Sequence, residues 1–431
     1  MKENPKTLIV GVDAWRTDSP SNTLQSIFSC WNPDKIALVY ARSNYPNCQV
    51  SRHYFQISEN KVLKSIFKPW LLTGREVKNV VEDVSDDIRQ EQKRYAKAHK
   101  KYSPFMTLCR EIVWILGHWK KKALKEFVEV FEPDILFLPI FNKWYMCQIE
   151  LFLVKLTKKP YVVYYADDDF SYDMCHDMLS YLHRFVLRKY VRKLIMGSRE
   201  IFVIADKVKE EIDSIFEKDC KLLTKGVDFE KVHYDEKIIN SPIRFVYTGN
   251  LLIGRDQTMI SIAKAINTLD PNGKKAVLDI YSQTELSEET LARLNCGGCK
   301  FKGKVSREMI DGIQRDADVL IFAEALNGKD VYAARMSFST KLTDYMANGK
   351  CIFAVGTPNI APIHYLRKYD AALIATTEKE IMNQIHQILE HPEIIKVYGR
   401  KAIECAKRNH NKAEIDATFC KTMYEAAKHN D

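Results

Sequence analysis

The chain has 431 residues, of which 46% are hydrophobic and 28% charged, so it has the composition of a globular protein long enough for two domains. No apolar run approaches the roughly 18 to 20 residues that span a bilayer, and the run 8–12 is too short for a signal peptide, which argues against a membrane-spanning or secreted protein. The formal charge of +9 lies in the first half: residues 1–200 hold 32 Lys and Arg against 23 Asp and Glu, and residues 201–431 hold 33 of each.

Short apolar runs alternate with helical patterns through the first half of the chain. The runs are rich in Ile, Val, Leu and aromatic residues and predict buried strands at 7–12, 35–40, 134–139, 161–166 and 200–205. Longer amphipathic stretches at 103–131 and 177–195 predict helices. Alternation of strands and helices in this order is typical of a parallel, doubly wound sheet.

The same alternation starts again after a charged connector. Strands are expected at 244–248, 275–281, 301–304, 319–323 and 351–355, and helices at 257–269, 287–294, 306–315 and 341–348. We therefore predict an N-terminal domain of residues 1–228, a linker of residues 229–242 and a C-terminal domain of residues 243–408. A C-terminal helical segment, 409–431, could pack back on the N-terminal domain.

The first candidate anion site is the loop that follows the strand 244–248. Gly249 lets the backbone approach a bulky anion closely, and the guanidinium of Arg255 can bind two phosphate oxygens at once. The loop has neither the GxGxxG spacing of dinucleotide-binding proteins nor the Walker spacing GxxxxGK[ST]. A simple turn between a strand and a helix explains the loop equally well.

The second candidate is the start of the helix at 341–348. Ser339 and Thr340 are favourable N-cap residues, and Asn348-Gly349 can end the helix. The amino end of this helix presents unpaired N–H groups and a positive dipole, with two hydroxyls and Lys341 beside it, which predicts a diphosphate site. Asp344, one turn further on, could accept hydrogen bonds from ribose hydroxyls.

These motifs carry a resemblance to a known family. Phe301-Lys-Gly-Lys-Val305, Ala317-Asp-Val-Leu-Ile321 and Ser339-Thr-Lys-Leu-Thr-Asp-Tyr-Met-Ala-Asn-Gly-Lys350 have the order and spacing of family-4-like glycosyltransferases (glycosyltransferase group 1) of bacterial surface-polysaccharide synthesis. The segment Leu223-Thr-Lys-Gly-Val-Asp228 is similar to the domain junction of these enzymes. The resemblance implies an α/β fold of the GT-B type, in which two Rossmann-like doubly wound parallel-sheet domains face a cleft.

Residue by residue, the resemblance implies a donor site in the C-terminal domain. It puts Gly249 at the donor phosphates, Arg255 at the position of the usual phosphate-binding lysine and Asn250 at that of the usual arginine. Lys304 and Val305 match the segment that holds the base through its backbone.

One position departs from the family. Asp344 matches the second glutamate of the family's Glu, seven residues, Glu motif, which binds ribose, but the first glutamate falls at Met336. Met336 cannot hold the donor sugar, and Glu324 or Asn327 in the preceding loop could replace it. Ser339, Thr340 and Lys341 would then carry more of the diphosphate binding.

Three carboxylates, Asp167-Asp-Asp169, follow the strand 161–166, at the edge where α/β sheets bind ligands. Their pKa values would be coupled, so one carboxyl could stay protonated near neutral pH. The resemblance puts Asp167 or Asp168 where the family often has a histidine that touches the donor sugar, and we assign catalytic roles to both, with Arg255 and Lys341. Alternatives are a helix cap and the metal-binding carboxylate pair of GT-A enzymes, which leaves the second series of strands unexplained.

Candidate acceptor contacts follow the first strand. Asp13 and Arg16 are polar and should lie at the same edge of the sheet, and Trp15 either stacks on a sugar ring or anchors the core. The basic stretches 97–101, 120–122 and 184–193 predict either a surface for anionic lipid or solvated helix faces. We expect no nucleic-acid partner, because no recognised binding motif accompanies the charge.

The resemblance implies a hexosyltransferase-type enzyme. It would move a sugar from a nucleotide-sugar donor, a UDP- or GDP-sugar, to a hydroxyl of a glycan or lipid-linked acceptor, with retention, in capsule or lipopolysaccharide synthesis. We expect no cofactor and no metal, because fixed cations would stabilise the leaving diphosphate. The alternatives are other GT-B chemistry, such as polyol-phosphate transfer or sugar-nucleotide epimerisation, and a non-catalytic scaffold that binds nucleotide sugars.

Eleven scattered cysteines, an odd number, fit a reducing compartment rather than a disulfide framework. We therefore expect a cytoplasmic protein that could lie peripherally on the inner face of the cell membrane.

Overall fold

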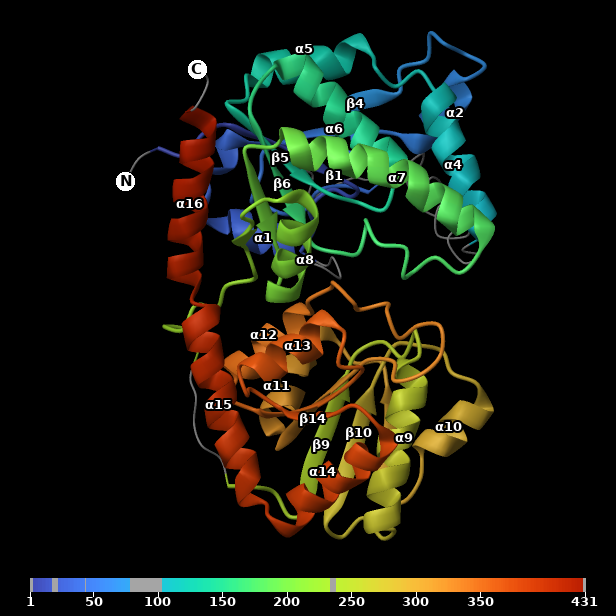
Figure 1. Ribbon diagram of the computed structural model, residues 1–431, viewed down its shortest axis with the longest axis vertical. Coiled ribbons are helices and arrows are strands. Elements are labelled where there is room, and N and C mark those ends of the chain that lie inside the picture. Colours follow the sequence, from blue (N-terminus) through green and yellow to red (C-terminus); the bar gives the residue numbers. More distant parts are fainter. Residues whose placement is uncertain (1–2, 18–21, 43, 78–102, 233–237, 429–431) are drawn as a thin grey trace. The chain divides into compact units, whose positions relative to one another are not determined.

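A computed structural model describes residues 3–17, 22–42, 44–77, 103–232 and 238–428 of the chain. The chain forms two compact units (Figure 1). The first comprises residues 1–204, 208–224 and 416–431, and the second comprises residues 205–207 and 225–415. The division after residue 224 lies a few residues before the expected boundary at 228, and part of the expected linker, 233–237, lies outside the described residues.

The first unit contains an eight-stranded sheet of order β4-β3-β2-β1-β5-β6-β7-β8. Neighbouring strands are parallel except β3 and β4, which are antiparallel. The central strands are buried along their whole length, because helices cover both faces of a parallel sheet. The strands are β1 (Thr7–Gly11), β2 (Ile36–Tyr40), β3 (His53–Ile57), β4 (Gly74–Val77), β5 (Ile135–Pro139), β6 (Tyr161–Tyr165), β7 (Glu200–Val203) and β8 (Lys221–Leu222).

Helices connect and cover these strands: α1 (Thr23–Ile27), α2 (Glu59–Ser65), α4 (Pro104–Leu116), α5 (Lys122–Phe131), α6 (Trp144–Thr157), α7 (Met178–Gly197) and α8 (Asp206–Phe216). The single helix predicted over 103–131 is wrong, since the structure divides it into α4 and α5. Gly117 ends α4 in an extended conformation, and a Cβ at this position would lie 2.4 Å from a methyl group of Val62. The helix therefore stops where its backbone meets α2.

The second unit contains a six-stranded sheet of order β11-β10-β9-β12-β13-β14, in which every described pair is parallel. Its strands are β9 (Ile243–Thr248), β10 (Ala276–Tyr281), β11 (Cys299–Gly303), β12 (Val319–Ala323), β13 (Cys351–Val355) and β14 (Leu373–Ala375). Its helices are α9 (Arg255–Leu269), α10 (Glu288–Leu294), α11 (Arg307–Asp316), α12 (Thr340–Ala347), α13 (Ala361–Lys368), α14 (Glu378–Glu390) and α15 (Glu393–Asn409). The predicted α/β class, with two doubly wound parallel sheets, is confirmed.

The C-terminal helix α16 (Lys412–Lys428) belongs mainly to the first unit. Phe419 is 1% exposed, and its ring lies 5.2 Å from that of Phe28, 6.0 Å from that of Phe137 and 5.5 Å from that of Phe202. These contacts join α16 to β5 and β7. The helix is therefore part of the core of the first unit, although the whole second unit separates the two in sequence.

Among the described residues, no helix is both long enough and apolar enough to cross a bilayer. The eleven cysteines all carry free thiols.

One carboxyl in the core of the first unit has no compensating partner. Glu150 in α6 is fully buried, and neither of its carboxyl oxygens accepts or donates a hydrogen bond within the described part of the chain. Burial, together with the nearby charge of Asp169, raises the pKa of Glu150 well above its usual 4.5. The folded protein therefore keeps this carboxyl protonated where the unfolded chain has released the proton.

We predict that Glu150→Met raises the free energy of unfolding by about 1–3 kcal/mol at pH 8, because it removes a buried polar group without a partner. The gain should be smaller at pH 5, since a raised folded-state pKa makes the native protein lose stability as pH rises above about 4.5. Urea denaturation at both pH values measures it. Glu129→Met, at an exposed position in α5, is the control and should change stability by less than about 0.5 kcal/mol. An equal gain at pH 5 and pH 8 would contradict the titration of Glu150 as the cause.

Candidate functional site

The strand order of the second sheet reverses between β9 and β12. The chain continues from β9 to β10 on one side of this point and from β12 to β13 on the other. The loops that follow β9 and β12 therefore diverge and leave room for a ligand between them. The loop 249–254 follows β9, and Glu324 follows β12 directly. The predicted donor residues Gly249, Asn250, Arg255 and Glu324 therefore come together at the edge where parallel sheets bind ligands.

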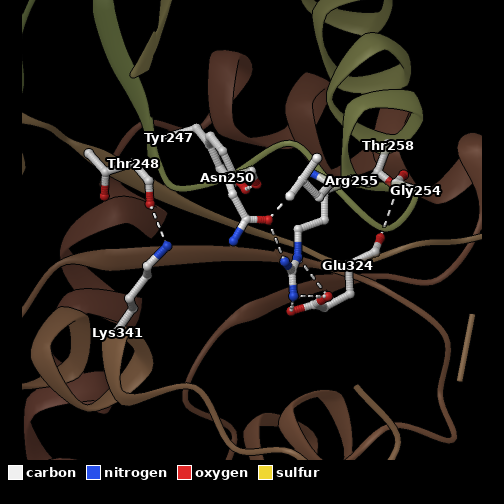
Figure 2. A network of polar contacts seen from close by, with 9 residues as sticks. Tyr247, Thr248, Asn250, Gly254, Arg255, Thr258, Glu324 and Lys341 are labelled. Atoms are coloured by element: carbon white, nitrogen blue, oxygen red, sulfur yellow. Dashed lines mark hydrogen bonds and ion pairs between the residues drawn. The ribbon is translucent and has the colours of Figure 1, made fainter. Parts of the chain in front are cut away.

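An ion pair joins these two loops (Figure 2). The guanidinium of Arg255 donates two hydrogen bonds to the Glu324 carboxylate, from Nε to Oε2 at 2.8 Å and from Nη2 to Oε1 at 3.0 Å. A third hydrogen bond, from Nη1 to Oδ1 of Asn250, is 2.7 Å long. The side chain of Arg255 is 20% exposed and that of Glu324 is 8% exposed. Arg255 is therefore held in one orientation while part of it still faces solvent.

The backbone around Glu324 is also fixed. Its N–H donates to the carbonyl of Val355 at 2.8 Å, and its carbonyl accepts a 2.8 Å hydrogen bond from the hydroxyl of Thr258 in α9. Gly254, the N-cap of α9, has φ = +72°, and a Cβ there would lie 2.8 Å from Cβ of Ala325. Only glycine lets α9 begin this close to the loop that carries Glu324.

Lys341 approaches the same loop from α12. Its ammonium donates a 3.0 Å hydrogen bond to the carbonyl of Thr248, the last residue of β9 (Figure 2). A Cβ on Gly249 would lie 2.6 Å from this ammonium and 3.0 Å from the hydroxyl of Tyr247. The absence of a side chain at residue 249 thus leaves room for the lysine beside the backbone.

The cluster of Arg255, Glu324 and Lys341 holds two cations and one carboxylate. Burial raises the pKa of Glu324, and the Arg255 guanidinium opposes this shift. Desolvation, followed by repulsion from Arg255, lowers the pKa of Lys341, so its charged form is less favourable here than in water. An anionic ligand would favour the charged form of Lys341 and offset its repulsion from Arg255, because it adds negative charge beside two cations.

The start of α12 lies beside this cluster. Ser339 is the N-cap residue, Thr340 is the first residue of the helix, and both are partly exposed. Asp344, one turn in, accepts a 2.5 Å hydrogen bond from Lys225, a residue of the segment at the domain junction. The Asp344 side chain is 45% exposed, so this ion pair leaves it accessible to a ligand.

The other residues that the sequence analysis considered for the donor have varied environments. Lys304 and Val305 follow β11, on the same edge of the sheet, and Lys304 is exposed. Met336 is 1% exposed and belongs to the core. Asn327 is exposed. Glu324, which we considered as the replacement for the missing glutamate, has its carboxylate bound to Arg255, so its direct role is to position that guanidinium.

The strand order of the first sheet reverses between β1 and β5, which marks a second edge of the same kind. Asp13, after β1, forms a 2.6 Å ion pair with Arg42, which follows β2. Arg16 donates a 2.8 Å hydrogen bond to the carbonyl of Tyr45. Both predicted contacts are thus part of a polar network at this edge.

Trp15 has a different environment from these polar neighbours. It is 5% exposed, and its ring lies 5.9 Å from that of Phe28 in the core. Of the two roles that we considered for Trp15, the structure supports the core anchor, since stacking on a sugar requires an exposed ring face.

The three carboxylates after β6 differ in burial. Asp167 is exposed. Asp168 accepts hydrogen bonds from the backbone and hydroxyl of Ser171, at 3.0 and 2.5 Å, and so organises the turn after the strand. Asp169 is 3% exposed, and burial, followed by the charge of Asp167, raises its pKa to about 8. The expectation that one carboxyl of the group stays protonated near neutral pH therefore applies to Asp169.

Lys143 was missed by the sequence analysis. It follows β5, on the opposite side of the reversal point from Asp13, and its ammonium has no hydrogen-bond or ion-pair partner within the described residues. Desolvation, followed by the charges of Arg42 and Arg110, lowers the pKa of Lys143 to about 8. Its only sequence signal is its place just after a buried strand.

Two residues of the basic stretch 184–193, Arg184 and Arg188, pack within the first unit. Arg184 donates to the carbonyl of Asp168 at 2.6 Å, and Arg188 donates to that of Phe170 at 2.6 Å and stacks on its ring. Lys189, Arg192 and Lys193 of the same stretch are exposed, so a lipid-binding role for this face of α7 stays a prediction that now rests on these three residues. The stretch 97–101 lies outside the described residues.

No group of three or more His, Cys, Asp or Glu side chains within the described ranges has the geometry to hold a metal ion.

The chain matches no protein-family model and no curated protein sequence. Its structure is similar to sucrose-phosphate synthase from Thermosynechococcus elongatus, with a TM-score of 0.62 and 11% identity over 97% of this chain and 98% of that one. HepE from Anabaena, in complex with UDP and glucose, gives 0.60 and 10% over 98% and 100%. TarM gives 0.60 and 8% over 97% and 98%. The chain therefore has the GT-B fold, as predicted.

We predict a strong coupling between Arg255 and Glu324. Arg255→Ala leaves the Glu324 carboxylate buried without its partner and should lower the free energy of unfolding by about 3 kcal/mol, more at pH 8 than at pH 5. A double-mutant cycle with Glu324→Gln should give a coupling energy of about 1–3 kcal/mol, measured by urea denaturation. Additive losses would show that the pair contributes nothing beyond its separate residues.

Proposed function

We propose that the chain is a glycosyltransferase that moves a sugar from a UDP- or GDP-sugar to a hydroxyl of a glycan or lipid-linked acceptor. The observation that carries the proposal is the cluster of Arg255, Glu324 and Lys341 beside Gly249, at the reversal point of the second sheet. Two cations, and a backbone that carries no side chain at Gly249, suit the diphosphate of a nucleotide sugar. The fold supports the same chemistry, because HepE binds UDP and UDP-glucose.

In the proposed reaction, the bond between the anomeric carbon and the diphosphate oxygen breaks, and the acceptor oxygen bonds to that carbon. Negative charge develops on the leaving diphosphate. Arg255, oriented by Glu324, and Lys341 would stabilise this charge with little reorganisation, as would the amino end of α12. This arrangement would make a metal ion unnecessary. We expect retention of the anomeric configuration and a place in surface-polysaccharide synthesis.

The remaining donor residues would bind the nucleoside. We assign the ribose to Asp344, which is partly exposed on α12, and the base to the backbone of Lys304 and Val305. The acceptor would bind to the first unit near Asp13, Arg16 and Lys143, and Asp167 is the exposed carboxylate there that could contact the sugar.

A non-catalytic scaffold that binds nucleotide sugars is the second candidate. It is favoured by the buried Met336, where a sugar-binding glutamate is expected, and by the engagement of Glu324 with Arg255. Other GT-B chemistry, such as polyol-phosphate transfer or epimerisation, would use the same diphosphate site. Release of free sugar from the donor, or transfer to an acceptor, would distinguish an enzyme from a scaffold.

We predict that one or more of the UDP-, GDP-, dTDP- and ADP-sugars raises the melting temperature, and that donor turnover persists in EDTA. Lys341→Met should weaken binding of that donor by about 10- to 100-fold, because it removes a charge-assisted hydrogen bond. Lys350→Met is the matched control: Lys350 also donates to main-chain carbonyls, those of Arg315 and Ala317, and should leave affinity unchanged. Equal losses in both variants, or no stabilisation by any donor, would contradict the proposed site.

Two glycines offer a second test. Gly249→Ala should displace the Lys341 ammonium, a flexible group, and so weaken donor binding at least about fivefold while changing stability by less than about 1 kcal/mol. Gly312→Ala, in α11, meets no atom within 4 Å and should raise stability by about 0.5–1 kcal/mol without changing affinity. Isothermal calorimetry and thermal unfolding measure both. Unchanged affinity in Gly249→Ala would exclude close approach of the donor at residue 249.

A further inference from the structure

Large apolar side chains gather on one part of the surface of the first unit. Thirteen of the 23 exposed large hydrophobic residues in the described chain fall in three segments, 63–72, 105–116 and 178–185. Phe67 is 81% exposed, Trp70 77% and Phe105 62%. Single exposed apolar residues are common on protein surfaces, but a group of them in one place usually marks an interaction site.

The apolar face of α4 points to solvent because the opposite face is anchored. Glu111 is buried, and its carboxylate accepts hydrogen bonds of 2.9 Å from the N–H groups of both Trp144 and Tyr145, at the start of α6. Trp114 is fully buried and stacks on Tyr145 with ring centroids 4.4 Å apart. These contacts leave Phe105, Met106, Ile112, Ile115 and Leu116 exposed.

The other two segments lie next to α4, which packs against both α2 and α7 (Figure 1). Arg110 of α4 forms an ion pair with Glu59 at the start of α2. The N–H of His118 donates a 2.8 Å hydrogen bond to the hydroxyl of Ser65, just before the turn 66–72. On the other side, Glu111 lies 3.2 Å from His183 of α7. The three segments therefore form one surface, which we call the α4 surface.

The charges at the α4 surface are almost all positive. The three segments hold four Lys and Arg and a single acidic residue, the buried Glu111, and Lys120 lies four residues beyond the second segment. Lys64, Lys68 and Lys120 are exposed. Protein–protein interfaces are depleted in lysine, whereas apolar and aromatic side chains bordered by lysine suit the boundary between acyl chains and anionic headgroups.

We propose that the α4 surface docks the protein on an anionic lipid bilayer. Phe67, Trp70 and Phe105 enter the interface, and Lys64 and Lys68 face the lipid phosphates. The docking rests on this surface alone and not on the proposed sugar transfer. It assigns the membrane contact to α2 and α4 rather than to the arginines of α7.

The test measures co-sedimentation of the full chain, without donor, with vesicles of phosphatidylcholine and phosphatidylglycerol in a 7:3 ratio. The wild type should bind these vesicles at least about tenfold more tightly than vesicles of pure phosphatidylcholine, and added salt should weaken the binding. Phe67→Ser/Trp70→Ser/Phe105→Ser should reduce binding at least about tenfold. Lys64→Gln/Lys68→Gln should reduce it about tenfold on anionic vesicles only.

The controls alter exposed residues elsewhere on the same unit. Val130→Ser/Ile215→Ser and Lys125→Gln/Lys155→Gln should bind vesicles as the wild type does, and circular dichroism should show that every variant is folded. Absence of wild-type binding at low salt, or equal binding by the aromatic variant, would overturn the proposal. A concentration-dependent dimer that the aromatic variant abolishes, with no vesicle binding, would instead assign the surface to a second copy of the chain. Because donor binding is measured separately, failure of docking leaves the proposed transfer untouched.

Discussion

The ion pair between Arg255 and Glu324 connects the two loops that diverge from the reversal point of the second sheet. Without Glu324, no carboxylate would offset the repulsion between the guanidinium and the nearby ammonium of Lys341, and the guanidinium would have several orientations available. With Glu324, the cluster keeps one net positive charge and a fixed geometry. A site that is ordered before its ligand arrives loses little entropy on binding, so this carboxylate can strengthen anion binding without touching the anion.

The fold could be predicted largely because its strands are continuous apolar runs. β12 and β13 have the bounds expected from sequence, since both faces of a central parallel strand are buried. The edge strand β4 and its neighbour β3 were not predicted, because both are short and contain polar residues that interrupt the apolar run. The break at Gly117 depends on contact with Val62, which no local pattern reveals.

The candidate site could be predicted only where its chemistry is local in sequence. Gly249 and Lys341 each belong to a recognisable strand–loop or helix-start pattern, and the structure brings them together. The partner of Arg255 lies 69 residues away, and that of Asp344 lies 119 residues away, so both depend on which loops the fold brings into contact. Lys143 belongs to no motif, because its environment comes from loops on neighbouring strands.

The position of α16 in the first core has a consequence for the order of events during synthesis. Phe419 packs against Phe28, Phe137 and Phe202, yet the ribosome produces it only after the entire second unit. The first unit therefore cannot complete its core as it emerges, and this apolar contact surface stays open while the second unit is translated. The usual rule that N-terminal domains finish folding first is reversed here: the second unit can close before the first.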